Sequence, residues 1–277
     1  MNYKFEDYLQ DPNLIINWNV IREAASLIST VEKKFVFLGE ETVMTATVKV
    51  GVKDFIIEEA KGSVNGKEYE VDELKGLYGY ISGKKAIKKK TMNKFPELSP
   101  LFLQCVSGLI QAETYVYDER GYNSKEEYNR YWDNLEEDGC RYYSSKRADL
   151  RASEPAWMEY VHDNFKATEL FKRQKRYSAV VEDGKLITVG FLNDTYHEMA
   201  ISMELNIQGN VLDFQIVFFR GPGQACFSNS ENSNMLKGWN IKDISKRDII
   251  KILGGCDGCY HIVELAVELV DVIRGSV

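Results

Sequence analysis

Residues 43–60, VMTATVKVGVKDFIIEEA, give the clearest indication of the fold. Over 43–50, valine, threonine and lysine alternate with Met44, Ala46 and further valines, and such alternation is typical of a half-buried strand. Gly51 then leads into a second run at 55–60. Two extended runs separated by a turn predict neighbouring strands of an antiparallel meander.

Helices are expected on both sides of this meander. Residues 13–32 place apolar side chains at helical spacing behind Pro12, which predicts an amphipathic helix. Residues 99–113 predict another helix, with Ser99 as its N-cap and Pro100 at its first helical position.

The second half of the chain repeats this order of elements. The expected elements are a helix at 155–175, strands at 176–182, 186–192, 199–207 and 211–219, and a closing helix at 260–274. Short strings also recur: DFII at 54–57 and LKG at 74–76 return as DFQI at 213–216 and LKG at 236–238, about 160 positions later. We interpret the chain as α+β, with two tandem similar units that are each a small antiparallel sheet covered by helices.

The expected division between the units falls near residue 150. Residues 1–150 form a degenerate first copy together with a linker at about 118–152, which is rich in tyrosine and charge and poor in aliphatic side chains. Residues 151–277 form the second copy, which carries the candidate site.

Composition restricts the classes of partner. The 277 residues contain 35 Lys and Arg against 42 Asp and Glu, and this net charge of −7 argues against a nucleic-acid partner. No stretch has the roughly 20 apolar residues of a membrane helix, and the N-terminal MNYKFEDYLQDPN lacks the pattern of a signal peptide. We therefore expect a cytoplasmic protein without a membrane partner, whereas a homo-oligomer or a protein partner stays open. The five cysteines are expected to be reduced thiols.

The strongest chemical signal is GGCDGCYHIVELAVELV, residues 254–270. Its glycines predict a tight turn, after which Cys259 stands at or near the N-terminus of an apolar helix. Backbone N–H groups and the helix dipole at that end favour a thiolate, which is the form that binds metal or attacks an electrophile. Cys256, Cys259 and His261 thus offer up to three ligands within one turn region.

Two further ligands come from other segments of the second unit. Cys226 follows the glycine turn at 221–223, and His197 precedes the next expected strand, whereas the aligned positions of the first unit carry neither cysteine nor histidine. The alternative is that these thiols pack in the core and that the histidines are ordinary hydrogen-bonded residues. Cys105 and Cys140 have no partners in sequence and are interpreted as packing residues.

A set of strings follows in order along the second unit: YHEM (196–199), Pro222 followed by Cys226, LKGW (236–239), GCYH (258–261) and Glu264-Leu265. Over about residues 175–272 this set resembles a bacterial family that is known only as a domain of unknown function. The resemblance brings no activity with it.

A more distant similarity is to the NifU-type iron–sulfur cluster assembly scaffold, which shares the order of strands, glycine turn and cysteine-bearing last helix. In that family, three cysteines and a histidine or aspartate hold a [2Fe-2S] cluster or zinc. Cys259 with Glu264 matches the last cysteine and its acid. The middle cysteine corresponds to Pro222, about one helical turn before Cys226, and His197 would have to replace the first cysteine. The resemblance implies a related fold and a metal site.

The leading hypothesis is therefore a cytoplasmic protein that binds zinc, iron or an iron–sulfur cluster. Cys259, Cys226 and His197 are its expected ligands, with His261 and Cys256 as further candidates. A second hypothesis is a thiol-dependent enzyme that acts on a small molecule with Cys259 as nucleophile. A third is a non-catalytic module for interaction or oligomerisation.

Overall fold

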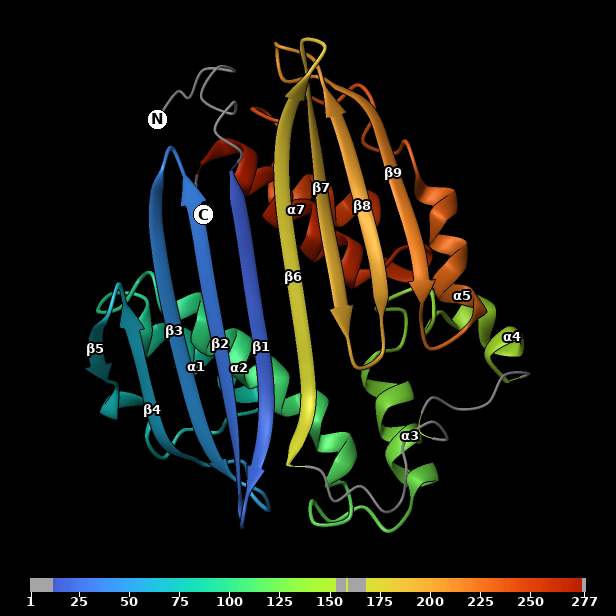
Figure 1. Ribbon diagram of the computed structural model, residues 1–277. Helices are drawn as coiled ribbons and strands as arrows, with labels where there is room; N and C mark the ends of the chain where they lie inside the picture. Colours follow the sequence, from blue (N-terminus) through green and yellow to red (C-terminus); the bar gives the residue numbers. More distant parts are fainter. Residues whose placement is uncertain (1–11, 153–157, 159–167, 276–277) are drawn as a thin grey trace.

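The computed structural model describes residues 12–152, 158 and 168–275, and in them nine strands form one antiparallel sheet (Figure 1). The strand order is β5-β4-β3-β2-β1-β6-β7-β8-β9. The strands are β1 (Asn13–Glu23), β2 (Ser26–Phe37), β3 (Glu40–Gly51), β4 (Ile57–Val64), β5 (Lys67–Glu70), β6 (Glu169–Glu182), β7 (Lys185–Asp194), β8 (Glu198–Leu205) and β9 (Val211–Arg220).

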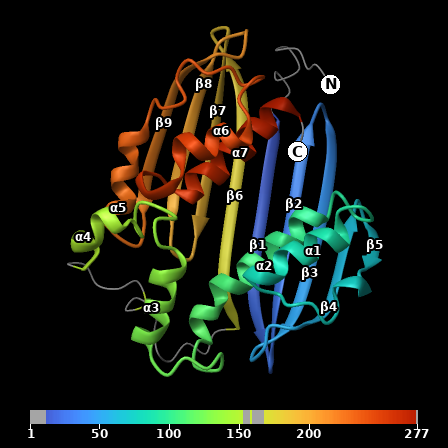
Figure 2. The ribbon, with the colours of Figure 1, turned by 180° about the vertical axis from the view of Figure 1, so that it is seen from behind.

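Helices cover one face of this sheet, while the opposite face carries none among the described residues (Figures 1 and 2). The helices are α1 (Lys84–Thr91), α2 (Ser99–Ala112), α3 (Lys125–Leu135), α4 (Ala148–Ala152), α5 (Gln224–Phe227), α6 (Lys246–Leu253) and α7 (Tyr260–Arg274). The α1–α2 pair packs on the strands of the first half, and the α6–α7 pair packs on those of the second. The core lies between the helices and the sheet.

The α+β class and several expected elements are confirmed. The meander at 43–60 corresponds to β3 and the first part of β4, and its inward side chains alternate with half-exposed ones. The helix expected at 260–274 is α7, and the one expected at 99–113 is α2. Leu98, rather than Ser99, is the N-cap of α2.

The helix expected at 13–32 is wrong, because these residues form β1 and part of β2. Leu14, Ile16 and Trp18 stand at every second position and are buried under the helices. Ile15 lies on the opposite face, so apolar residues on both faces of one strand imitate helical spacing. In the helix expected at 155–175, residues 169–175 belong to β6, and the remainder except residues 158 and 168 lies outside the described residues.

The expectation of two separate small sheets is also wrong. β1 and β6 pair antiparallel from Asn13↔Ser178 to Ile21↔Glu169, which joins both halves into one sheet. The pairing satisfies backbone groups that each half would otherwise leave open at an edge. Five strands in the first half and four in the second are each followed by a helix pair that packs on the sheet, α1–α2 and α6–α7. The boundary near residue 150 stays a prediction.

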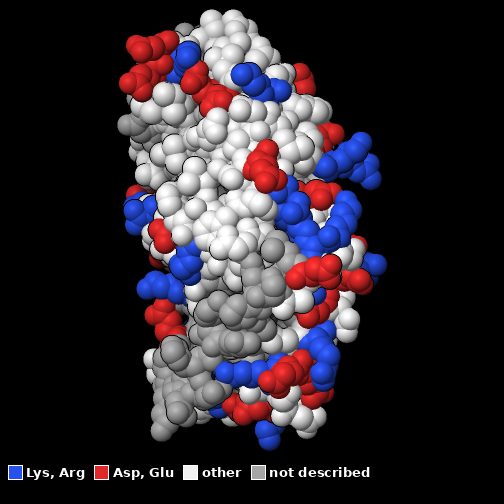
Figure 3. Space-filling view, turned by 90° about the vertical axis from the view of Figure 1, so that its right-hand side faces the viewer, with Lys and Arg blue, Asp and Glu red and all other residues white. Residues whose placement is uncertain are grey.

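The linker expected at 118–152 contains α3 and α4. The Tyr128 and Trp132 side chains of α3 are buried, so this segment packs into the molecule as well as connecting its halves. No helix among the described residues has the length and apolar character needed to span a membrane. The side that bears β9 presents a broad area with few charged side chains (Figure 3), and Val217 and Phe219 of β9 are exposed.

Candidate functional site

A pocket of about 390 Å³ lies between the helices of the two halves. The first half and the connecting segment supply one wall, which includes Lys84, Ser107 and Cys140. The second half supplies the other wall, from the β7–β8 turn, α5 and the start of α7. Both halves therefore build the pocket, although cysteine and histidine were expected to matter only in the second unit.

The pocket brings together four of the five ligands expected from the sequence. Cys226, Cys259, His197 and His261 all line it, although they come from α5, the N-cap of α7, the β7–β8 turn and α7 itself. Cys256 does not line it, because this residue lies in a turn where its Sγ is 3.5 Å from Asp257 Oδ2.

Glycine geometry fixes the backbone before α7. Gly255 has a φ of +73°, and a Cβ at Gly258 would lie 2.1 Å from the Leu253 carbonyl oxygen, so no other residue fits there without a shift. The Cys259 N–H donates to that same carbonyl at 2.8 Å. The turn therefore delivers Cys259 to the N-cap of α7, as expected from the sequence.

The expectation that Cys259 is a thiolate is wrong for the protein on its own. Burial raises the pKa of this thiol to about 12, and the N–H groups of His261 and Ile262 offset that effect only in part. A buried site without a cation disfavours the negative charge more than the helix N-terminus favours it. Cys259 is thus a neutral thiol at pH 7.

His197 is held by Asp194 at the end of β7. One carboxylate oxygen of Asp194, Oδ1, accepts hydrogen bonds from the backbone N–H groups of Tyr196 at 2.7 Å and His197 at 2.6 Å. The same oxygen lies 3.3 Å from His197 Nδ1. Because Nδ1 faces the carboxylate, Nε2 is the ring nitrogen that remains for a ligand, an arrangement common among metal-binding histidines.

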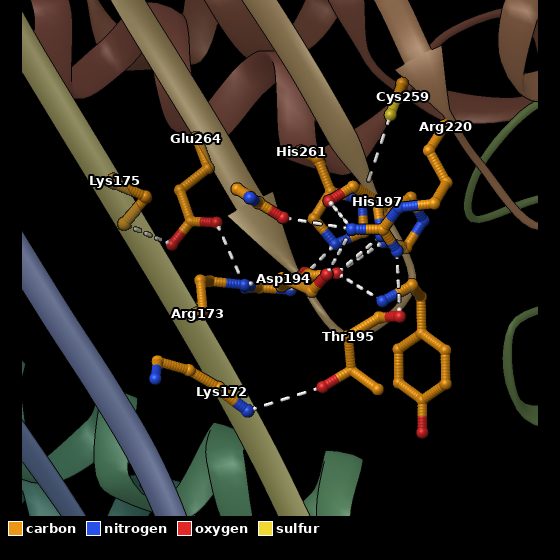
Figure 4. Close-up of polar contacts among 12 residues, drawn as sticks. Lys172, Arg173, Lys175, Asp194, Thr195, His197, Arg220, Cys259, His261 and Glu264 are labelled. Carbon is orange, nitrogen blue, oxygen red and sulfur yellow. Dashed lines mark hydrogen bonds and ion pairs between the residues drawn. The ribbon is translucent and has the colours of Figure 1, made fainter.

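Arg220 of β9 fixes the same turn from outside. Its guanidinium donates to the carbonyl oxygens of Thr195 at 2.8 Å and Asp194 at 2.6 Å, and to that of His197 at 3.3 Å. Figure 4 shows these contacts converging on the turn. Arg220 therefore ties the position of His197 to the edge strand of the sheet.

Arg173 of β6 occupies the centre of the polar cluster (Figure 4). It is buried and donates twice to Asp194 Oδ2, at 2.9 and 2.5 Å. Its guanidinium also lies 3.1 Å from His261 Nε2 and 3.6 Å from Glu264. A guanidinium only donates, so His261 Nε2 accepts and the proton of the neutral ring resides on Nδ1.

The protonation state of His261 agrees with that contact. Burial, followed by the charges of His197 and Arg173, lowers the pKa of His261 well below its usual value. Its Nδ1 faces Cys259 Sγ at 4.0 Å, and its ring centroid is 4.1 Å from that of His197. The two imidazoles and the thiol thus form one compact group at the pocket wall.

One group of three potential metal ligands stands out among the described residues, namely Asp194, His197 and His261. One donor atom from each of these residues lies within 4.8 Å of the other two. Asp194 is a poor ligand here, because Arg173 binds one of its oxygens and backbone N–H groups bind the other. A cation between these three side chains would also face the Arg173 guanidinium. Asp194 therefore fits the role of orienting His197.

Sequence reasoning missed Arg173, Asp194 and Arg220 of this region. Arg173 and Lys175 occupy inward positions of β6 between Phe171 and Tyr177, and charged residues on a buried strand face are a signal of a polar site. That signal was hidden because residues 169–175 were assigned to a helix.

Residues 163–274 match the sequence model of a family described as a protein of unknown function (DUF2889). This span agrees with the expected resemblance of the second unit to a bacterial domain of unknown function. No curated protein and no solved structure matches the chain. The matched span contains His197, Cys226 and Cys259 but none of the pocket wall supplied by the first half.

Proposed function

We propose that the protein binds a metal ion, zinc or iron, in this pocket through Cys226, Cys259 and His197. The observation that carries the proposal is that these residues, from separate elements of the chain, line one pocket. Thiol and imidazole are the donors preferred by zinc and by iron in sulfur-rich sites.

The environment of each donor supports this proposal. His197 is oriented by Asp194, as expected of a ligand with a carboxylate behind it. A bound cation would replace the proton of Cys259, so that metal binding would release a proton from a thiol that is otherwise neutral. Binding of one ion requires the thiols to rotate toward His197, because no group of three donors that includes them lies within 4.8 Å among the described residues.

Metal analysis of the full-length chain tests this function. The protein is purified without oxygen, and zinc and iron are quantified for the wild type, Cys259→Ser and Cys105→Ser. Cys105 is a matched control, because it is buried in the first half with its Sγ 3.3 Å from the Ala46 carbonyl oxygen. We expect about one metal per chain in the wild type and in Cys105→Ser, and loss of metal in Cys259→Ser. Absence of metal from all three, even after titration with zinc, would refute the proposal.

A thiol-dependent enzyme is the second candidate, and the contact between Cys259 Sγ and His261 Nδ1 favours it. In a small-molecule reaction, His261 would have to take the thiol proton. Its Nδ1 already carries a proton when Nε2 accepts from Arg173, so this nitrogen is not free to accept another one. We therefore prefer the metal-binding function to the enzymatic one. A non-catalytic module would instead retain its folding and assembly when Cys226, Cys259 and His197 are all replaced.

We also propose that the two halves are copies of one unit related to the NifU-type scaffold. Both halves have a run of antiparallel strands followed by a helix pair on the same face of the sheet, and this recurring order supports the relationship, although the first half has the additional strand β5. The corresponding places of α2 and α7 support it as well. Cluster assembly is not proposed.

A further inference from the structure

Cys140 was interpreted from sequence as a packing residue, but it lines the same pocket as Cys226 and Cys259. It lies in the connecting segment, outside the span that matches the family. Its backbone neighbour, Arg141, donates its N–H to the carbonyl oxygen of Gly258 at 2.7 Å. Because this hydrogen bond joins the backbones of residues 141 and 258, it holds the neighbouring residues Cys140 and Cys259 close to each other.

The side chain of Arg141 also holds the segment of Cys226 close to the segments of Cys140 and Cys259. This guanidinium is buried, with 4% exposure, and donates to the Asp257 carbonyl oxygen at 2.9 and 3.1 Å. It also donates to the Ser228 carbonyl oxygen at 2.5 Å, just beyond the helix that carries Cys226. One buried arginine thus joins the three segments that bear Cys140, Cys226 and Cys259.

The proposed ligands Cys226, Cys259 and His197 leave one place open in a four-coordinate site. His261 does not fit this place well, because ligation through Nδ1 would put its proton on Nε2, against the Arg173 guanidinium 3.1 Å away. Cys140 has no such conflict and offers a third sulfur to the same pocket.

We propose that Cys140 is the fourth ligand of the metal ion, which gives a set of three cysteines and one histidine built by both halves of the chain. This inference rests on the proposed function. It assigns a soft divalent ion such as zinc as the occupant, because three thiolates disfavour calcium and magnesium. It also means that residues 163–274 alone lack one ligand.

Cobalt(II) titration of the full-length protein tests the assignment, because a thiolate bound to cobalt gives a charge-transfer band whose intensity follows the number of thiolates. The variants are wild type, Cys140→Ser and the control Cys105→Ser. We expect Cys140→Ser to lose about a third of the band and to bind zinc at least about tenfold more weakly, with Cys105→Ser unchanged. Circular dichroism establishes that each variant is folded.

The outcomes separate this inference from the function on which it rests. A wild type without the band refutes metal binding itself. A wild type with the band and an identical Cys140→Ser refutes only the role of Cys140.

A measurement on the wild type covers the case in which Cys140→Ser fails to fold. Iodoacetamide labelling with and without bound zinc is followed for each cysteine by mass spectrometry. We expect zinc to slow labelling of Cys140 at least tenfold and to leave Cys256, outside the pocket wall, unchanged. Equal labelling of Cys140 in both states would overturn the inference.

Discussion

The first turns of α2 and α7 stand in corresponding places of the two halves, yet their surroundings differ. Ser99 at the start of α2 lies 2.6 Å from the hydroxyl of Thr91, and Leu101 is buried in the core. At the start of α7, Cys259 and His261 line the pocket. The same type of helix end thus carries packed side chains in one half and potential ligands at the pocket in the other.

The buried ion pairs of the two halves differ in the same way. In the first half, Arg120 pairs with the buried Glu113 at 2.8 Å, and the Tyr80 hydroxyl donates to that carboxylate at 2.5 Å. In the second half, Arg173 pairs with Asp194, and imidazoles take the place of the phenols. Tyrosine side chains surround the Arg120–Glu113 pair, which therefore has a structural role. The Arg173–Asp194 pair instead orients two histidine rings that line the pocket.

Removal of one partner from each pair has the largest expected effect. Arg173→Ala leaves Asp194 buried without its cation and is expected to cost about 3–5 kcal/mol of unfolding free energy, measured by urea denaturation. Arg120→Ala is expected to cost a comparable amount, because Glu113 is equally enclosed. Only Arg173→Ala should also weaken metal binding.

The control for this pair of variants is Arg176→Ala. Arg176 is on the same strand as Arg173 but on its exposed face, so its removal is expected to change stability by no more than about 0.5 kcal/mol. If Arg173→Ala were as harmless as Arg176→Ala, the ion pair would not support the site.

Acid titration is expected to reveal the next largest effect, through Glu264 of α7. Burial would raise the pKa of this carboxyl, but the charges of Lys175 and Arg173 outweigh it and lower the pKa to about 2. The folded value lies below the ordinary value of 4.5, so the stabilisation is complete above pH 4.5 and is lost as the pH falls toward 2. Glu264→Gln should flatten the pH dependence of unfolding free energy in this window.

Glu68→Gln serves as the control for that profile, since Glu68 is exposed on the edge strand β5. Its pH dependence should coincide with that of the wild type. An unaltered slope in Glu264→Gln would mean that the Lys175–Glu264 pair contributes little to folding.

Local pattern predicts some elements of this protein and not others. The β3–β4 meander and α7 follow from periodicity within a single stretch, and the turn before α7 already places Cys259 near His261. β1 escapes such reasoning because apolar residues occupy both of its faces. The same limit applies to Cys140, whose place in the site depends on a hydrogen bond between residues 141 and 258. Contacts between distant segments leave no periodic trace in the sequence.

The rate at which each cysteine reacts with iodoacetamide extends the comparison of the two halves to single thiols. With its pKa raised to about 12 by burial, Cys259 should react with iodoacetamide at pH 7 at least about 100-fold more slowly than a cysteine of ordinary pKa. Mass spectrometry of the labelled peptides gives the rate at each cysteine, and labelling in urea shows that each thiol can react. A fast reaction confined to Cys259 would favour the thiol-enzyme candidate over the metal site.

The smallest expected effect comes from giving α2 the cysteine that α7 has. Ser99→Cys is made in the Cys259→Ser background, so that any cobalt–thiolate band must arise from the first half. We expect no band and a stability change within about 1 kcal/mol, because the new thiol would lie against the Thr91 hydroxyl in the core. A band in this variant would show that a cysteine at a helix N-terminus is sufficient. Its absence would mean that the pocket, built by both halves, makes the site.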